Sequence, residues 1–354
     1  MTDVAKHAGV STMTVSRVLN ENSHVTDGLR VKVFAAIQEL RYQPNELARS
    51  LREQRSRQIG IIVPYLYDPF FAICADAIST VAKQHSYSIV LATSNEDPNA
   101  EFEEANRMLR RNVEGLIVIP AHFDIPQSLL LASDFRRMPI VSLDRPIEGS
   151  PYDSLLVDNE GGGRMGTKHL LDLGHKRVVY LGLSDNLFTM RMRHQGYDQA
   201  MRAAGLEPRS AILSSDLDSS LATLRKLLSG RSKPTALFCA NNLLTRHVLH
   251  SLQVMDLHPP SPVALVGFDD FETADLLRPG VTVVRQPNEH LGRAAAECLF
   301  SRLAQTDRSH PGATTILPVE LVIRGSCGAS VRTMSATPSR DSRVPKIYSN
   351  GSTA

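Results

Sequence analysis

The 354-residue sequence predicts an α/β protein that carries a small all-α head at its N-terminus. Two observations predict this fold class. The first 41 residues contain short amphipathic helical segments, whereas short apolar runs alternate with helical segments from residue 58 onward. Strands that alternate with helices are typical of a doubly wound, mostly parallel sheet. The length allows two or three domains and a large buried core.

The head begins with two short helices joined at Gly9. Residues 3–8 carry apolar side chains at spacings of three and four, and Ser11 is a candidate N-cap for a second helix over residues 12–19. A third helix over about residues 27–41 would close a small core over these two. This outline fits a helix-turn-helix, whose second helix enters the DNA major groove. An ordinary helical hairpin has the same outline, so the helix pattern alone leaves both interpretations open.

The second helix carries side chains suited to contacting DNA. Arg17 can offer a guanine two donors in a fixed plane, while Thr12 and Met13 present methyl groups that can meet a thymine methyl. Thr14 and Ser16 favour phosphate contacts, together with the amides at the helix N-terminus. In an ordinary hairpin, Arg17 would instead be a solvated surface charge.

Five short motifs follow one another along this part of the chain: Asp3-Val-Ala-Lys, Ala8-Gly-Val-Ser, Thr14-Val-Ser-Arg-Val-Leu-Asn20, Tyr42-Gln-Pro-Asn45 and Ala48-Arg-Ser-Leu51. From Asp3 to about Arg57 the chain resembles the DNA-binding headpiece of the lac repressor family of bacterial transcription regulators. The resemblance implies a homodimer that binds double-stranded operator DNA and changes its affinity when a small effector binds the core. The DNA contacts that we expect come from Ser11, Thr12, Met13, Thr14, Ser16, Arg17, Asn20, Asn45, Ala48, Arg49 and Leu51.

Residues 44–57 are rich in arginine and offer few apolar side chains to bury. A short helix of this kind is marginal alone in water. The resemblance implies a hinge helix that orders on operator DNA, pairs with its dimer mate and inserts Leu51 into the minor groove. Without the resemblance, the segment fits a simple interdomain linker with Leu51 packed on the core.

The core contains two series of apolar runs that alternate with helical segments. The first series has runs at 59–63, 87–91, 114–119 and 139–142, and the second has runs at 154–157, 177–181, 212–213, 236–239 and 263–266. Two series predict two α/β lobes. The resemblance, which extends to Gly325, implies a core like that of periplasmic sugar-binding proteins, in which later segments cross back so that each lobe receives chain from both halves.

These observations predict four parts of the chain: a helix-turn-helix head (1–44), a hinge helix and linker (45–57), a two-lobed effector-binding and dimerisation domain (58–328) and a disordered tail (329–354). Within the core, we expect an N-lobe of about 58–156 and 286–315 and a C-lobe of about 157–285 and 316–328. The tail is rich in Ser, Thr, Arg, Pro and Gly, a composition that is typical of disorder.

Ligands of doubly wound sheets bind beyond the carboxyl ends of the strands. Asp144, Asn241 and Asp269 follow predicted strands, and the resemblance implies that they bind effector hydroxyls. It also implies that Arg193 contacts the effector and that Phe71 lies against the effector ring. A fork of donors beside carboxylate acceptors is sugar-recognition chemistry.

Each of these strand-end residues has an alternative role as a helix N-cap. For Asn242 and Asp270 we favour the N-cap. The chain also departs from its family, because most relatives read Asn-Asp where this chain has Asn241-Asn242. The identity of a carbohydrate-like effector therefore stays open.

An enzyme interpretation depends on Gly161-Gly-Gly-Arg-Met-Gly166, which has the Gly-x-Gly-x-x-Gly spacing of a dinucleotide site. Asp158 and Glu160 would place negative charge where a pyrophosphate must sit. His247 and His250 lack further residues spaced as metal ligands. We therefore expect no cofactor, no metal and no enzymatic activity. The alternative is a sugar-binding or sugar-modifying α/β protein without a DNA function.

Charge and cysteine placement agree with this interpretation. Residues 1–57 hold nine Lys and Arg against six Asp and Glu, whereas the remainder holds thirty against thirty-one. The modest basic excess thus lies with the head. The four cysteines are scattered, which fits reduced thiols. Because no apolar signal or run of about eighteen apolar residues occurs, we expect a cytoplasmic protein without a membrane partner.

Overall fold

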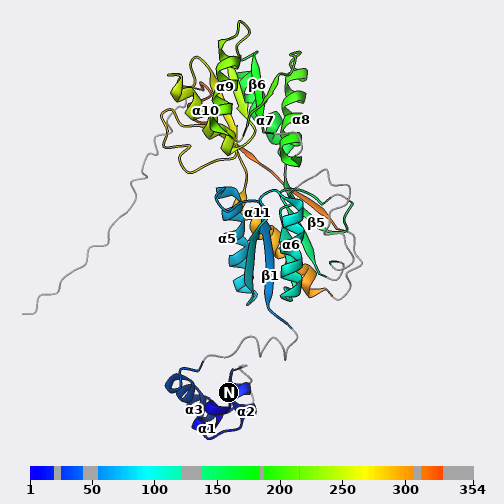
Figure 1. The fold of residues 1–354 in the computed structure, drawn as a ribbon, viewed down its shortest axis with the longest axis vertical. Helices are drawn as coiled ribbons and strands as arrows, with labels where there is room; N and C mark the ends of the chain where they lie inside the picture. Colours follow the sequence, from blue (N-terminus) through cyan, green and yellow to red (C-terminus); the bar gives the residue numbers. More distant parts are fainter. Residues whose placement is uncertain are drawn as a thin grey trace, which may run out of the picture. The chain divides into compact units, whose positions relative to one another are not determined.

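The computed structural model describes residues 1–19, 25–42, 55–121, 135, 138–147, 149–183, 187–214, 216–305 and 312–329. These residues form a helical head and two mostly parallel sheets with helices on their faces (Figure 1). The chain divides into two compact units, which comprise residues 1–159, 185–191 and 286–319, and residues 160–184, 192–285 and 320–354. The predicted fold class is confirmed. No helix in the described ranges is long and apolar enough to cross a membrane.

The head contains α1 (Thr2–Ala8), α2 (Thr12–Leu19) and α3 (Asp27–Glu39). Gly9 ends α1 with a φ of 66°, a left-handed conformation that favours glycine. Ser11 caps α2 as predicted, because its hydroxyl accepts the backbone N–H of Thr14 at 3.1 Å. The three helices bury a small core that consists of Val4, Ala5, Val15, Val18, Val25, Val33 and Ala36.

The first unit contains a parallel sheet in the order β11-β5-β4-β3-β1-β2. Its strands are β1 (Gln58–Val63), β2 (Ser88–Thr93), β3 (Gly115–Val118), β4 (Ile140–Leu143), β5 (Asp153–Val157) and β11 (Thr314–Leu317). Ile61 packs with helices α5 (Pro69–Gln84) and α11 (Asn288–Ala304), whereas Ile62 packs with α6 (Pro98–Arg110). Successive strand residues point to opposite faces, so these helices cover the two faces of the sheet.

The second unit contains a sheet in the order β12-β10-β9-β8-β6-β7. Its strands are β6 (Val178–Gly182), β7 (Ser210–Ile212), β8 (Ala236–Cys239), β9 (Ala264–Phe268), β10 (Thr282–Arg285) and β12 (Glu320–Val322), and its helices are α7 (Asn159–Asp172), α8 (Phe188–Ala203), α9 (Leu217–Ser229) and α10 (Asn242–Val254). β12 pairs antiparallel with β10, and the other pairings are parallel. The four residues of β8 are all buried, as expected for a central strand with helices on both faces.

Two features of the sheets differ from the series of apolar runs in the sequence. The run at 154–157 opens the second series, but as β5 it pairs with β4 and β11 in the first sheet, beside strands of the expected N-lobe of about 58–156. Strand β11 itself is not among the predicted strands, because its side chains are mostly exposed and lack a long apolar run. The sequence also predicts a helix near residues 126–136, and this segment, apart from Phe135, lies outside the described residues.

The glycine-rich run lies inside helix α7, and its glycines allow α7 and α8 to approach closely. A Cβ atom added at Gly163 would collide with the backbone carbonyl of Arg193. A Cβ atom at Gly196 would likewise collide with the backbone carbonyl of Glu160. The run therefore serves helix packing in this structure, and it places Arg193 beside the sheet.

We predict that Gly163→Ala destabilises the second unit by about 1–3 kcal/mol, because backbone atoms cannot swing away from the added methyl group. The gain in helix propensity, about 0.5–1 kcal/mol, offsets only part of this loss. Urea denaturation of the full chain measures the effect. Gly230→Ala is the control in the same unit, since no atom lies within 4 Å of an added Cβ there. Equal stabilities of the two variants would contradict the packing role.

Candidate functional sites

The exposed side of α2 carries the polar residues that the sequence assigns to DNA. Thr12, Met13 and Arg17 are exposed and Ser16 is half-buried, while the opposite side packs into the head core. Positions 12, 13, 16 and 17 lie on one helix face, because residues three to four apart are neighbours. Met13 is 63% exposed, so its side chain is accessible to a partner.

The hydroxyls of Ser11 and Thr14 form part of the α2 cap. Their oxygen atoms lie 2.9 Å apart, and the Ser11 hydroxyl also accepts the N–H of Thr14. These two residues therefore shape the start of α2 in addition to any contact with DNA. The other residues expected to contact DNA, namely Asn20, Asn45, Ala48, Arg49 and Leu51, lie outside the described residues.

Arg193 and Asp269 come together at the carboxyl ends of β8 and β9. Nη1 of Arg193 donates to the carbonyl oxygen of Ala240 at 2.7 Å and to Oδ2 of Asp269 at 3.2 Å. The guanidinium lies 3.7 Å from the centre of the Phe268 ring, a cation–π contact. Arg193 is 2% exposed, so its charge is held in a buried, preorganised position.

Asn241 takes the N-cap role that the sequence analysis favoured for Asn242. Asn241 is the N-cap of α10, and its Oδ1 accepts the backbone N–H of Leu244 at 2.9 Å. Asn242 is the first residue of the helix and is buried. The expected N-cap role of Asn242 is therefore wrong, because α10 begins one residue earlier than that role requires. Any effector contact by Asn241 has to come from an amide whose oxygen already caps the helix.

Asp144 follows β4 in the first unit and resembles Asp269 in its backbone. Both aspartates adopt left-handed conformations, with φ of 65° and 69° respectively. The N–H of Asp144 donates to the carbonyl oxygen of Leu155 at 2.9 Å, and the N–H of Asp269 donates to that of Val284 at 2.8 Å. Both are largely buried. Left-handed backbone is uncommon outside glycine and often marks a functional position.

The residue after Asp144 is a buried arginine. Arg145 donates to both carboxylate oxygens of Glu96 at 2.7 and 2.8 Å, and its Nε lies 3.6 Å from Oδ2 of Asp144. The nearby carboxyl of Glu101 accepts the N–H of Ala121 at 2.7 Å, and burial raises the pKa of Glu101 to about 7. This carboxyl therefore carries only part of its charge near neutral pH.

Phe71 and Phe70 both belong to the core of the first unit. Each is 6% exposed, and their rings meet edge to face with centroids 5.2 Å apart. The helix that carries them is capped by Asp68, whose Oδ1 accepts the N–H of Phe70 at 3.0 Å. Phe71 is thus fixed by packing at the start of α5, after the carboxyl end of β1.

Sequence reasoning missed the ionic partners of Asp270. No helix begins directly after this residue, since the next described element is β10, so the predicted N-cap role is wrong. The carboxylate of Asp270 instead binds Arg285 and Arg324. The available signal was that Arg285 and Arg324 directly follow the apolar runs at 281–284 and 320–323. The partners lie 15 and 54 residues away, a separation that local patterns do not resolve. The described residues contain no group of three or more His, Cys, Asp or Glu side chains that could hold a metal ion.

Comparisons with known proteins agree with this architecture. Residues 1–45 match the family model for bacterial regulatory proteins of the lacI family, and residues 167–327 match the model for a periplasmic binding protein-like domain. The HTH-type transcriptional repressor PurR of Mannheimia succiniciproducens is 32% identical over 329 residues, which cover 92% of this chain and 97% of the relative. The ribose operon repressor of Escherichia coli is 31% identical over 310 residues, 86% of this chain and 93% of the relative.

Solved structures show the same relationship. The lac repressor dimer bound to operator and the anti-inducer ONPF matches with a TM-score of 0.82 and 28% identity, over 92% of this chain and 98% of that one. A complex of the transcriptional regulator CelR with cellobiose matches with a TM-score of 0.68 and 29% identity, over the same shares. This chain belongs to the lacI family of bacterial regulatory proteins.

Proposed function

We propose that this chain is a cytoplasmic, homodimeric repressor that binds operator DNA through α2 and is switched by a small carbohydrate-like effector. The observation that carries the proposal is the exposed face of α2, with Thr12, Met13, Ser16 and Arg17 on a helical head that precedes an α/β core. Arg17 reads a guanine, the methyl groups meet thymine, and the start of α2 contacts phosphate.

The head comprises residues 1–44, and residues 45–57 form the hinge helix and linker in this proposal. Asn20 adds a contact at the end of α2, and Asn45, Ala48 and Arg49 contact the DNA from the hinge. Leu51 enters the minor groove at the centre of the operator. Residues 58–328 bind the effector and form the dimer, and residues 329–354 are a disordered tail.

Arg193, Asp269, Asp144, Asn241 and Phe71 bind the effector. The buried contact between Arg193 and Asp269 supports this role, since it presents a planar donor group beside carboxylate acceptors. Vicinal hydroxyls of a sugar match such a pattern, because each hydroxyl both donates and accepts. The effector changes operator affinity by binding the two conformational states of the dimer unequally.

The alternative, a sugar-binding or sugar-modifying protein without a DNA function, is not favoured. The relatives reported above are transcriptional repressors, and this chain matches nearly their whole length. We therefore also propose that the chain has no enzymatic activity and needs no cofactor. The test of the whole proposal is a binding selection from random duplexes followed by gel shifts at several salt concentrations. A chain that enriches no sequence over random DNA contradicts it.

Arg17→Ala is predicted to weaken binding to the selected operator by about 1–3 kcal/mol and to change binding to random DNA little. The reason is that a base contact is lost, whereas a backbone contact would weaken both. Gel shifts with both duplexes measure the two losses. Lys32→Ala is the control, because it removes the same charge from an exposed position on α3. Equal losses on operator and random DNA would show that Arg17 grips only phosphate.

Arg193→Lys is predicted to weaken effector binding by about tenfold or more, since a charge-assisted hydrogen bond is worth about 1.5–3 kcal/mol. The lysine keeps the charge beside Asp269 but loses the planar fork. Thermal shifts and gel shifts with D-ribose, cellobiose, D-galactose and D-gluconate measure the response. Arg202→Lys is the control at the exposed end of the same helix. Operator affinity without sugar should stay unchanged, and an unchanged sugar affinity would remove Arg193 from the site.

A further inference from the structure

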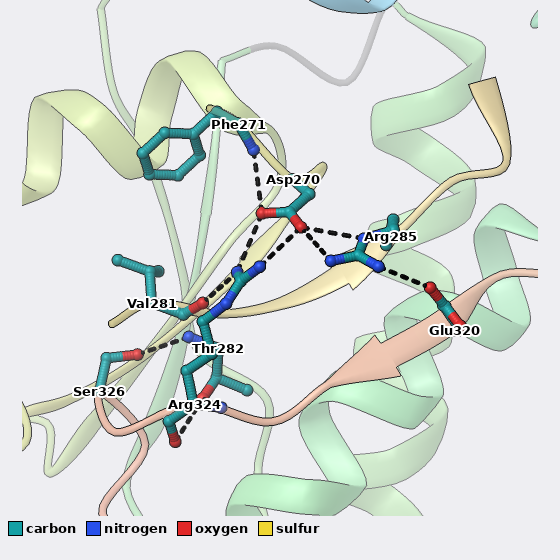
Figure 2. Close-up of polar contacts among 8 residues, drawn as sticks. All are labelled: Asp270, Phe271, Val281, Thr282, Arg285, Glu320, Arg324 and Ser326. Atoms are coloured by element: carbon teal, nitrogen blue, oxygen red, sulfur yellow. Dashed lines mark hydrogen bonds and ion pairs between the residues drawn. The ribbon is translucent and has the colours of Figure 1, made fainter. Parts of the chain in front are cut away.

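The carboxylate of Asp270 is the centre of an ionic cluster in the second unit (Figure 2). Its Oδ1 accepts the N–H of Phe271 at 3.0 Å and Nη1 of Arg324 at 2.9 Å. Its Oδ2 accepts Nη2 of Arg324 at 2.8 Å, together with Nε and Nη2 of Arg285 at 2.9 and 2.6 Å. One carboxylate therefore receives five hydrogen bonds, four of them from two guanidinium groups.

The two arginines extend this cluster to neighbouring strands. Nη1 of Arg324 also donates to the carbonyl oxygen of Val281 at 2.7 Å, directly before β10. Nη1 of Arg285, at the end of β10, donates to Oε1 of Glu320 at 3.0 Å, at the start of β12. Burial raises the pKa of the Asp270 carboxyl, whereas the hydrogen bonds from Arg324 and Arg285 lower it. Together the hydrogen bonds and charges of the two arginines outweigh burial, so the pKa lies below its ordinary value. The carboxylate is therefore charged at neutral pH and binds both arginines.

Asp269 and Asp270 hold strand β10 in two different ways. The backbone N–H of Asp269 donates to the carbonyl oxygen of Val284, and the side chain of Asp270 binds Arg285, the next residue of that strand. Asp269 is the proposed effector ligand that contacts Arg193. Asp269 is therefore linked to β10 by one main-chain contact of its own and by the ionic contact of its neighbour Asp270.

Arg285 and Glu320 occupy special positions along the chain. Arg285 is the last residue of the second unit before the chain passes to the first, and Glu320 is the first residue after it returns. The two residues face each other in the antiparallel register of β10 and β12. Two of the segments through which the chain passes between the units begin or end at Arg285 and Glu320. The ionic cluster thus links both segments to the end of β9, which is followed by Asp269.

We propose that Asp270, Arg285 and Arg324 are positioning residues that couple the effector at Asp269 to the two connecting strands, and so to operator affinity. This inference rests on the proposed function, because it needs an effector at Asp269. The first unit offers a parallel, since the residue after its left-handed aspartate, Arg145, is likewise held by a bidentate ion pair. In both units an ion-paired residue thus follows directly after the left-handed aspartate.

The geometry of the cluster shows which substitutions change its hydrogen bonds and keep its net charge. Arg324 binds both oxygens of Asp270 with its two terminal nitrogens, a fork that a lysine cannot form. Arg324→Lys and Arg285→Lys therefore keep the charge balance of the cluster but loosen its geometry. Arg278→Lys is the matched control, because Arg278 is exposed and donates only to carbonyl oxygens of residues 275–277 in the described contacts.

The experiment measures operator affinity of the full chain without sugar and at saturating concentrations of D-ribose, cellobiose, D-galactose or D-gluconate. In the wild type, a coupled effector changes operator affinity by about 5- to 150-fold. We expect both lysine variants to keep operator affinity within about twofold without sugar, and to lose most of that change at saturation, whereas Arg278→Lys responds fully. Saturation removes any effect of a weakened sugar affinity.

Each other outcome is decisive. Lysine variants that respond as fully as the wild type overturn the coupling role and leave the proposed function intact. Variants that lose operator affinity in step with their melting temperature show a purely structural role and also overturn it. A wild-type chain that binds operator but responds to none of the four sugars overturns both this inference and the proposed effector class. If Arg324→Lys fails to fold, the Arg285→Lys variant alone decides the test, because the Arg285 side chain is 41% exposed and its replacement disturbs the core less.

Discussion

Parallel hydrogen bonding that continues one residue past a buried strand fixes both proposed effector aspartates. Asp144 donates its N–H to β5 and Asp269 donates its N–H to β10, although each has already turned into the left-handed region. A non-glycine residue in that region costs free energy and persists only where its surroundings hold it. The ladder contact and the ion-paired residue that follows supply this constraint. The orientation of both carboxylates therefore depends on backbone hydrogen bonds to the neighbouring strands β5 and β10.

The two sheets repeat one strand order with different chemistry at corresponding positions. β4 and β9 each occupy the third place in their sheet, flanked by β5 and β10 respectively. Arg145 follows the first aspartate and binds Glu96, whereas Asp270 follows the second and binds two arginines. Burying an unpaired charge is costly, so each sign of charge requires a partner of the opposite sign from another element. The same left-handed backbone at the aspartate is thus followed by a cation in the first unit and by an anion in the second.

Local patterns predict the helices well and the long-range contacts poorly. The sequence predicts helices over residues 242–254 and 288–304, and α10 and α11 have these bounds, because helical patterns over many residues are easier to identify than short strands. β11 is not predicted, since its pairing with β5 joins residues about 160 positions apart and its own side chains are exposed. The Asn241 cap shows how poorly local patterns locate the end of an element. A shift of one residue in the start of α10 decides which of two adjacent asparagines is the N-cap.

The sequence predicts only part of the proposed site, because local patterns do not show which distant residues come into contact. The structure brings Arg193 and Asp269 together as a strand-end site requires, but the family resemblance, rather than the spacing, first singled them out. The ion pairs of Asp270 and Arg145 depend on which strands become neighbours. That neighbourhood follows from the whole topology and has no local signature in the sequence.

The glycines of α7 show how helix packing fixes the position of Arg193, a proposed effector ligand. Each glycine in a helix interior costs about 0.5–1 kcal/mol of helix stability, so such a run persists only where packing compensates. Here the compensation is the backbone contact of Gly163 with Arg193 and of Gly196 with Glu160. The contact sets how closely α8 approaches α7, and with it the place of the Arg193 guanidinium over Phe268. A spacing that resembles a phosphate-binding turn therefore serves helix packing, because its context is a helix interior rather than a strand-to-helix turn.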